Sequence, residues 1–225
     1  MLQCIARKQA RMPAPPEHFL RSRGVTPNRW ISRFVFSVAA ILMAVISGCN
    51  SEVSSAQLDL LDLAGRQINP FQGAHAKAAV FLFTRSDCPI SNRYAPEVRR
   101  LHEKFAPRNV TFWLVYPDKD ESVDVIRKHV QEYGYNFNVL RDPRHTLVKM
   151  TGARVTPEAA VFAPGGPNGR MVYRGRIDDR YVDFGKARAA PTTRDLEQVL
   201  EAIVEGKPVA ARTTPAVGCI IQDLQ

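Results

Sequence analysis

Two cysteines stand where redox chemistry is expected. The chain holds four in all: Cys4, Cys49, Cys88 and Cys219. Cys88 follows an apolar run and precedes Pro89-Ile90-Ser91, so we expect it at the junction of a buried strand and a helix. Backbone N–H groups and the positive end of a helix stabilise a thiolate at such a place. The position therefore predicts a lowered pKa and a reactive sulfur.

The neighbours of Cys88 bear on that prediction. Arg85 favours the thiolate, whereas Asp87 opposes it. The alternative is a small buried apolar residue with an inert thiol, but a cysteine in the first helical turn is placed to meet a substrate. Ser91 can hydrogen-bond a thiolate, yet it cannot attack a mixed disulfide. A second sulfur must therefore come from elsewhere.

Cys219 is our candidate for that second sulfur. It belongs to the apolar stretch 214–221 of the polar C-terminal tail 206–225, which suits docking on a domain better than free solvation. The preceding residues 205–218 are long enough to lead the chain back to Cys88, since they reach up to roughly 45 Å when extended. Two alternatives stay open: an inert tail cysteine, and one that pairs with a partner protein.

The remaining pattern predicts the elements that position these residues. Strands buried on both faces are expected at 78–84, 110–116 and 158–162, and shorter strands at 58–63, 138–140 and 171–173. Helices are expected to Phe105 from an N-cap at Ser86 or Asp87, and over 121–133, 145–150 and 193–204. This order predicts an α/β fold with a mixed central sheet and helices on both faces.

These motifs resemble the thioredoxin superfamily, and within it the redoxin branch that includes the AhpC/TSA family. The matching residues are FLFT (81–84), Cys88-Pro89-Ile90-Ser91 and Val155-Thr156-Pro157. The resemblance covers roughly residues 58–205 and implies a thioredoxin-like domain there. It also implies a cis peptide bond before Pro157, with the Thr156-Pro157 loop beside Cys88, where it binds an incoming thiol or peptide. Segments 87–97 and 173–185 look like those of an exported bacterial subgroup.

The resemblance implies thiol–disulfide or peroxide chemistry through Cys88, with Arg85 and Ser91 at the substrate site. The sequence departs from the families' patterns at three points. Ser91 replaces the second cysteine of C-x-x-C, and Asn92 replaces that of the copper chaperones. The peroxidase motif P-x-x-x-T-x-x-C is incomplete, because Thr84 is one residue out of register. No metal and no cofactor are therefore expected.

Three functions are compatible with this pattern. The first is a thiol–disulfide oxidoreductase that acts on protein thiols or disulfides through Cys88, resolved by Cys219. The second is a thiol-dependent peroxidase, and the third is a non-catalytic binding module that holds a partner in the proline groove. His102 and His129 fall on expected helices and are interpreted as surface residues. The loop 178–181 is either part of the substrate groove or a solvated charged loop.

The N-terminal segment 1–48 predicts export. It carries seven Lys or Arg residues and a single acid, and so holds most of the formal net charge of +9. A nucleic-acid partner is not expected, because this basicity suits a targeting segment better than a binding surface. With 45% hydrophobic and 24% charged residues, the composition is that of a globular protein and excludes disordered and fibrous classes.

An uncharged run at 34–46 follows the basic residues and ends at Ser47-Gly48-Cys49, which resembles a bacterial lipobox. As a helix the run spans roughly 20 Å, less than the roughly 30 Å hydrocarbon core of a bilayer. We expect a protein of the cell envelope or periplasm, held to the membrane by a lipid on Cys49 through a tether at 49–57. The alternatives are an uncleaved single-pass anchor and a true start at Met12. Processing would leave two free thiols, Cys88 and Cys219.

Overall fold

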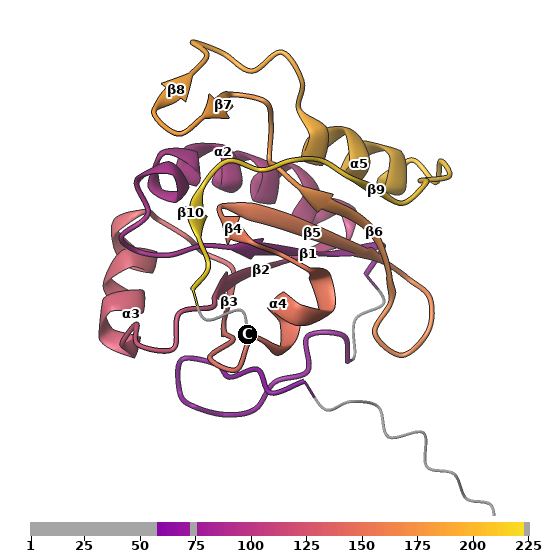
Figure 1. Cartoon of the computed structure of the whole chain (residues 1–225). Coiled ribbons are helices and arrows are strands. Elements are labelled where there is room, and N and C mark those ends of the chain that lie inside the picture. Colours follow the sequence, from indigo (N-terminus) through magenta and orange to yellow (C-terminus); the bar gives the residue numbers. More distant parts are fainter. Residues whose placement is uncertain (1–57, 73–75, 223–225) are drawn as a thin grey trace, which may run out of the picture. The chain divides into compact units, whose positions relative to one another are not determined.

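The fold is built around β1 (Ala78–Phe83), whose side chains enter the cores on both faces of a sheet. It pairs in parallel with β2 (Val110–Tyr116) and antiparallel with β5 (Glu158–Ala163). The sheet order is β3-β2-β1-β5-β6-β9, with β3 (Asn138–Arg141), β6 (Arg170–Gly175) and β9 (Arg212–Thr213) outside (Figure 1). The computed structural model describes residues 58–72 and 76–222, which lie in one compact unit. The export segment, Cys49 and the tether lie outside these residues.

Helices cover both faces of this mixed sheet, as predicted. One core is formed by α2 (Pro89–Phe105), α3 (Val123–Glu132) and α5 (Asp195–Val204). The other contains α4 (Thr146–Thr151). Alternate side chains of β1 serve the two cores, because successive residues of a strand point to opposite faces. The apolar run at 78–84 is thus a central strand buried on both sides.

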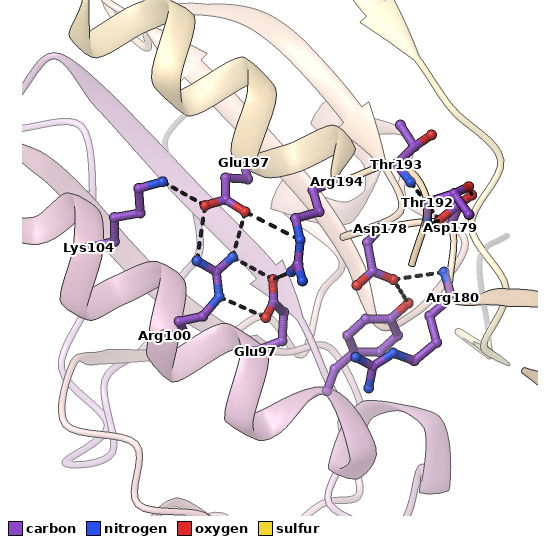
Figure 2. A network of polar contacts seen from close by, with 11 residues as sticks. Glu97, Arg100, Lys104, Asp178, Asp179, Arg180, Thr192, Thr193, Arg194 and Glu197 are labelled. Atoms are coloured by element: carbon purple, nitrogen blue, oxygen red, sulfur yellow. Dashed lines mark hydrogen bonds and ion pairs between the residues drawn. The ribbon is translucent and has the colours of Figure 1, made fainter. Parts of the chain in front are cut away.

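Helix α2 is held against α5 by a network of ion pairs between charged side chains, which we call the charged lattice (Figure 2). Arg100 of α2 donates to Glu97 at 2.7 Å and to Glu197 of α5 at 2.6 Å. Lys104 donates to Glu197 at 2.7 Å, and Arg194 donates to Glu97 at 2.8 Å. Each carboxylate in this lattice therefore meets at least two cations. The contacts hold the helix that follows Cys88 in a fixed position on the sheet.

Two local predictions are wrong. Residues 58–63 do not form a strand; Leu61 makes only isolated bridges, because the Asp62 carboxylate accepts from the backbone of Ala64 and Arg66 and closes a turn. The N-cap of α2 is Cys88 itself, with φ −85° and ψ 109°. Ser86 and Asp87 are engaged otherwise: the Ser86 N–H donates to Glu121, and the Asp87 carboxylate accepts from Arg85.

Two polar segments are more buried than their sequence suggests. His129 is 3% exposed and bonds to the Tyr116 hydroxyl at 2.6 Å, so its interpretation as a surface residue is wrong. The loop at 178–181 is not a solvated charged loop either. The hydroxyl of Tyr94 donates to buried Asp178 at 2.5 Å, and Asp179 accepts from the backbone N–H of Thr192 at 2.7 Å.

The C-terminal tail docks on the domain through two short strands. After α5, β9 pairs in parallel with β6, and β10 (Cys219–Ile220) pairs antiparallel with β4 (Val155–Thr156) (Figure 1). A short hairpin, β7 (Tyr181–Asp183) and β8 (Lys186–Ala187), completes the fold. No helix within 58–72 and 76–222 is long and apolar enough to cross a membrane.

Candidate active site

Cys88 lies at the start of α2 against the loop that contains Pro157. Its side chain is fully buried, and its Sγ donates to the carbonyl oxygen of Thr156 at 3.0 Å. The Thr156–Pro157 peptide bond is cis, as the resemblance implied. The junction of strand and helix and the proline loop therefore meet at one sulfur.

Cys219 is brought to the same place by the tail. In the pairing of β10 with β4, Cys219 lies opposite Thr156, the residue whose carbonyl contacts Cys88. Cys219 is partly exposed, whereas Cys88 is not. Both cysteines are free thiols in this structure. The docking of the apolar tail thus brings the two thiols close enough for each to shift the pKa of the other.

Two buried hydroxyl groups also act on Cys88. Ser91 Oγ and Thr156 Oγ1 are buried and have no hydrogen-bond partner among the described residues. Both side chains stabilise the charged form of Cys88 as hydrogen-bond donors. A thiolate would therefore satisfy polar groups that a thiol leaves unpaired.

The two thiols differ in acidity. Burial by itself raises the pKa of Cys88, but hydrogen bonds from the side chain of Cys219 and from Ser91 outweigh it, so the net pKa is lowered. For Cys219, burial and the hydrogen bond that it donates to Cys88 raise the pKa to about 12. Of the two thiols, Cys88 therefore loses its proton more readily.

Arg85 is placed differently from the sequence expectation. Its guanidinium donates to Asp87 at 2.8 Å and lies 3.6 Å from Asp118. The direct electrostatic effect of Arg85 falls on Cys219, whose pKa it lowers against the larger effect of burial. The groups that lower the pKa of Cys88 are therefore side-chain hydroxyls, backbone groups and a thiol. The guanidinium of Arg85 is instead paired with the carboxylates of Asp87 and Asp118.

Sequence reasoning missed three residues that shape this site. Glu121 accepts from the Ser86 N–H at 2.9 Å and so holds the loop before Cys88. Gly218 packs against Thr156 so closely that an added Cβ would lie 2.2 Å from its carbonyl oxygen. Ile221 is 3% exposed and belongs to the second core. A glycine directly before the tail cysteine and an aliphatic residue two after it were the available signals.

Within the described residues, no group of three or more His, Cys, Asp or Glu side chains is arranged to hold a metal ion. The chemistry that we consider for the site is that of its two sulfurs. One is a buried thiol whose pKa is lowered, and the other is a partly exposed thiol whose pKa is raised. Such a pair can carry out two-electron oxidation and reduction by forming and breaking a disulfide.

A mixed sheet, a cysteine at a helix start and a cis-proline loop define a thioredoxin-fold oxidoreductase. The chain belongs to the AhpC/TSA family, whose model matches residues 52–173.

Two solved structures share this fold. An uncharacterized conserved protein from Geobacillus kaustophilus has 25% identity and a TM-score of 0.63, covering 74% of this chain and 88% of its own. A hypothetical protein from Sinorhizobium meliloti has 22% identity and a TM-score of 0.62, covering 72% and 88%. No curated protein matches the sequence significantly.

Proposed function

We propose that the protein is an exported, lipid-anchored thiol–disulfide oxidoreductase in which Cys88 is the nucleophile and Cys219 the resolving thiol. The observation that carries this proposal is the register of β10 on β4. It sets Cys219 opposite Thr156, whose carbonyl oxygen is 3.0 Å from the sulfur of Cys88. Thr156, Pro157 and Ser91 form the walls of the substrate site. Arg85 borders it on the side of Cys219.

The reaction balances with two sulfurs and a substrate disulfide. The Cys88 thiolate attacks one substrate sulfur, a Cys88–substrate disulfide forms, and the other substrate sulfur leaves as a thiolate. The Cys219 thiolate then attacks the Cys88 sulfur, which releases the second substrate thiolate and leaves a Cys88–Cys219 disulfide. The substrate gains two electrons and the protein loses two. A dithiol runs the sequence in reverse.

The high pKa of Cys219 fits the second step. Part of that shift comes from the hydrogen bond to Cys88 and from its charge. Once Cys88 is in a mixed disulfide, its charge is gone, and this part of the shift is removed. The resolving thiol thus becomes more acidic only after the first step has taken place. This order protects the reduced pair from losing both protons at once.

A peroxidase is the second candidate, because the chain belongs to the AhpC/TSA family. In that reaction the Cys88 thiolate attacks a peroxide oxygen, hydroxide or alkoxide leaves, and Cys219 converts the sulfenic acid into a disulfide with release of water. The guanidinium of Arg85 is paired with Asp87 and Asp118, and Thr84 is one residue out of register with the peroxidase motif. These features favour disulfide exchange over peroxide reduction.

Export and anchoring rest on the N-terminal sequence. The basic segment, the apolar run at 34–46 and the Ser47-Gly48-Cys49 motif support a lipid on Cys49. An envelope location would also supply the oxidising surroundings in which a disulfide pair persists. Mass spectrometry of the membrane fraction tests this part of the proposal. A chain that still carries residues 1–48 and no lipid would contradict it.

The catalytic proposal is tested by insulin reduction with dithiothreitol, beside peroxide consumption, for the wild type, Cys88→Ser and Cys219→Ser. We expect insulin reduction to fall to background in Cys88→Ser. Cys219→Ser should accumulate a mixed disulfide on Cys88 that can be trapped. Full activity of Cys88→Ser would overturn the proposal, and peroxide consumption without insulin reduction would establish the second candidate.

A further inference from the structure

The edge of β4 next to Pro157 is already occupied by a strand of the same chain. β10 lies antiparallel on it, with Cys219 opposite Thr156 and Ile220 opposite Val155. The N–H of Ile221 continues the pairing and donates to the carbonyl of Arg154 at 2.9 Å. An extended segment with a cysteine beside Cys88 therefore fits this edge, and the tail shows in which register.

The site selects the residue before the cysteine. An added Cβ at Gly218 would lie 2.2 Å from the Thr156 carbonyl oxygen and 2.6 Å from the carbonyl carbon. These are backbone atoms, which cannot turn aside as a side chain would. Glycine is thus required at this position of any strand that docks in the same register.

The site also selects the second residue after the cysteine. Ile221 is 3% exposed and packs in the core that contains Leu60, Phe83 and Leu147. Ile220, directly before it, is 72% exposed, so the residue type at this position is not restricted by packing. The edge therefore recognises glycine, then cysteine, then any residue, then an aliphatic residue.

The tail is held at Thr214, before β10, so β10 can detach from β4 while the preceding part of the tail stays bound. Thr214 is held by the Tyr173 hydroxyl at 2.7 Å and by the Arg174 carbonyl at 3.0 Å. Beyond Thr214, residues 215–218 lead to a strand of only two residues. While β10 is docked, Cys88 is fully buried. A protein partner can therefore reach Cys88 only when β10 has moved off the edge.

We propose that the tail is an internal copy of the protein's partner polypeptide, displaced when that partner binds, and that the β4 edge selects the pattern Gly-Cys-x-aliphatic in it. The inference rests on the proposed function, since it takes Cys88 as the nucleophile. A polypeptide is favoured over a small thiol, because only a polypeptide supplies both the backbone pairing and the buried aliphatic side chain.

The test uses the full chain with Cys219→Ser and a peptide that copies residues 216–222. The peptide cysteine is joined in a disulfide to 5-thio-2-nitrobenzoate. The Cys88 thiolate attacks the peptide sulfur, the Cys88–peptide disulfide forms, and the coloured thiolate leaves. The Cys88→Ser/Cys219→Ser chain gives the blank for all other thiols.

We expect the copy peptide to react roughly ten-fold faster than one with alanine in place of the glycine, and than one with aspartate two residues after the cysteine. Aspartate directly after the cysteine should leave the rate unchanged, since that side chain faces solvent. In the protein, Ile221→Asp should raise the rate by undocking β10, whereas Ile220→Asp should not. Gly218→Ala provides a second way to undock the tail.

Equal rates for all four peptides would overturn the docking proposal, as would identical rates in the Ile221→Asp and Ile220→Asp proteins. The symmetrical disulfide of 5-thio-2-nitrobenzoate, a small substrate, distinguishes failure of the docking proposal from failure of the proposed function. If that disulfide reacts with Cys88 above the blank but the peptides are not discriminated, only the docking inference fails. If neither it nor any peptide reacts in any variant, the proposed function fails as well.

Discussion

The start of helix α2 and its contact with α5 carry opposite kinds of polar chemistry. At its start, Cys88 is surrounded by groups with unfulfilled hydrogen bonding, among them the buried hydroxyls of Ser91 and Thr156. Further along, the carboxylates of Glu97 and Glu197 are saturated by arginine and lysine side chains (Figure 2). Both regions are held by the same helix and the same sheet.

This difference separates a reactive site from a scaffold. Buried polar groups are nearly always paired, so each group left without a partner needs an explanation, and a thiolate on Cys88 would supply one for Ser91 and Thr156. The saturated lattice, by contrast, is charged at neutral pH and contributes to stability. Substitutions at the start of α2 should therefore change the reactivity of the sulfurs with little effect on unfolding, and substitutions in the lattice should do the reverse.

The strongest test of the reactive region is Gly218→Ala. The added methyl would meet the Thr156 carbonyl at 2.2 Å, so β10 should leave β4 and remove Cys219 from Cys88. We expect the effective concentration of the two thiols for each other to fall by roughly a hundred-fold, since a docked strand becomes a flexible tether. Equilibration of the disulfide with glutathione measures it.

Ala216→Gly, in the same stretch of tail, is the matched control and should leave the value unchanged. The free energy of unfolding should change little in either variant. A Gly218→Ala protein with the wild-type effective concentration would show that the tail docks without this close contact.

The scaffold is tested by Glu197→Gln. Hydrogen bonds from Arg100, with smaller help from Lys104 and against the effect of burial, lower the pKa of Glu197 to about 2. We expect a loss of about 1–2 kcal/mol in the free energy of unfolding at neutral pH, because the cations are partly exposed and the interaction is screened. Urea unfolding measures it, and the alkylation rate of Cys88 should stay the same.

The pH dependence gives this prediction its sign. A carboxyl whose pKa is lowered on folding contributes its stability above the unfolded value of 4.5, and loses it as the pH falls toward 2. The wild type and Glu197→Gln should therefore converge in that interval. Glu205→Gln is the control, because Glu205 pairs only with exposed Lys207 at 2.7 Å among the ion pairs of the described residues. A Glu197→Gln protein as stable as the control would show that the lattice adds nothing.

The sequence predicts the central parts of this molecule well. The continuous apolar runs at 78–84 and 110–116 can only be buried strands, and a cysteine followed by proline marks the helix start. The apolar stretch in the tail also indicates docking, because seven such residues in a polar tail are better buried than solvated. These signals are local, and they lie in residue types and spacing.

What the sequence leaves open depends on tertiary contacts. β9 and β10 have two residues each, too few to show a periodicity. His129 looks like a surface residue until the Tyr116 hydroxyl supplies a partner for it. The donors to the Cys88 thiolate cannot be ranked from sequence, since Arg85 is closer in the chain than Cys219 but is bound by carboxylates.

The smallest effect is expected for Ser91→Ala, which removes one of the hydroxyl donors to Cys88. Ser91 lowers the pKa of that thiol through its side chain and its backbone N–H, and only the side-chain part is lost in the variant. A hydrogen bond to a charged group is worth about 1.5–3 kcal/mol when fully formed, and the remaining donors compensate in part. We therefore expect the pKa of Cys88 to rise, by less than the loss of a full hydrogen bond would give.

An alkylation-rate titration measures this change and also tests its origin. Because the pKa rises, Ser91→Ala should react a few-fold more slowly than the wild type near neutral pH. The two rates should meet above both pKa values, where each protein carries the full thiolate. Ser86→Ala is the matched control, because Ser86 is not among the groups that lower the pKa of Cys88 and its backbone N–H still donates to Glu121 in the variant. A rate that stays low at every pH would show that Ser91 acts on access to the sulfur, and an unchanged pKa would leave Cys219 as the main donor to the thiolate.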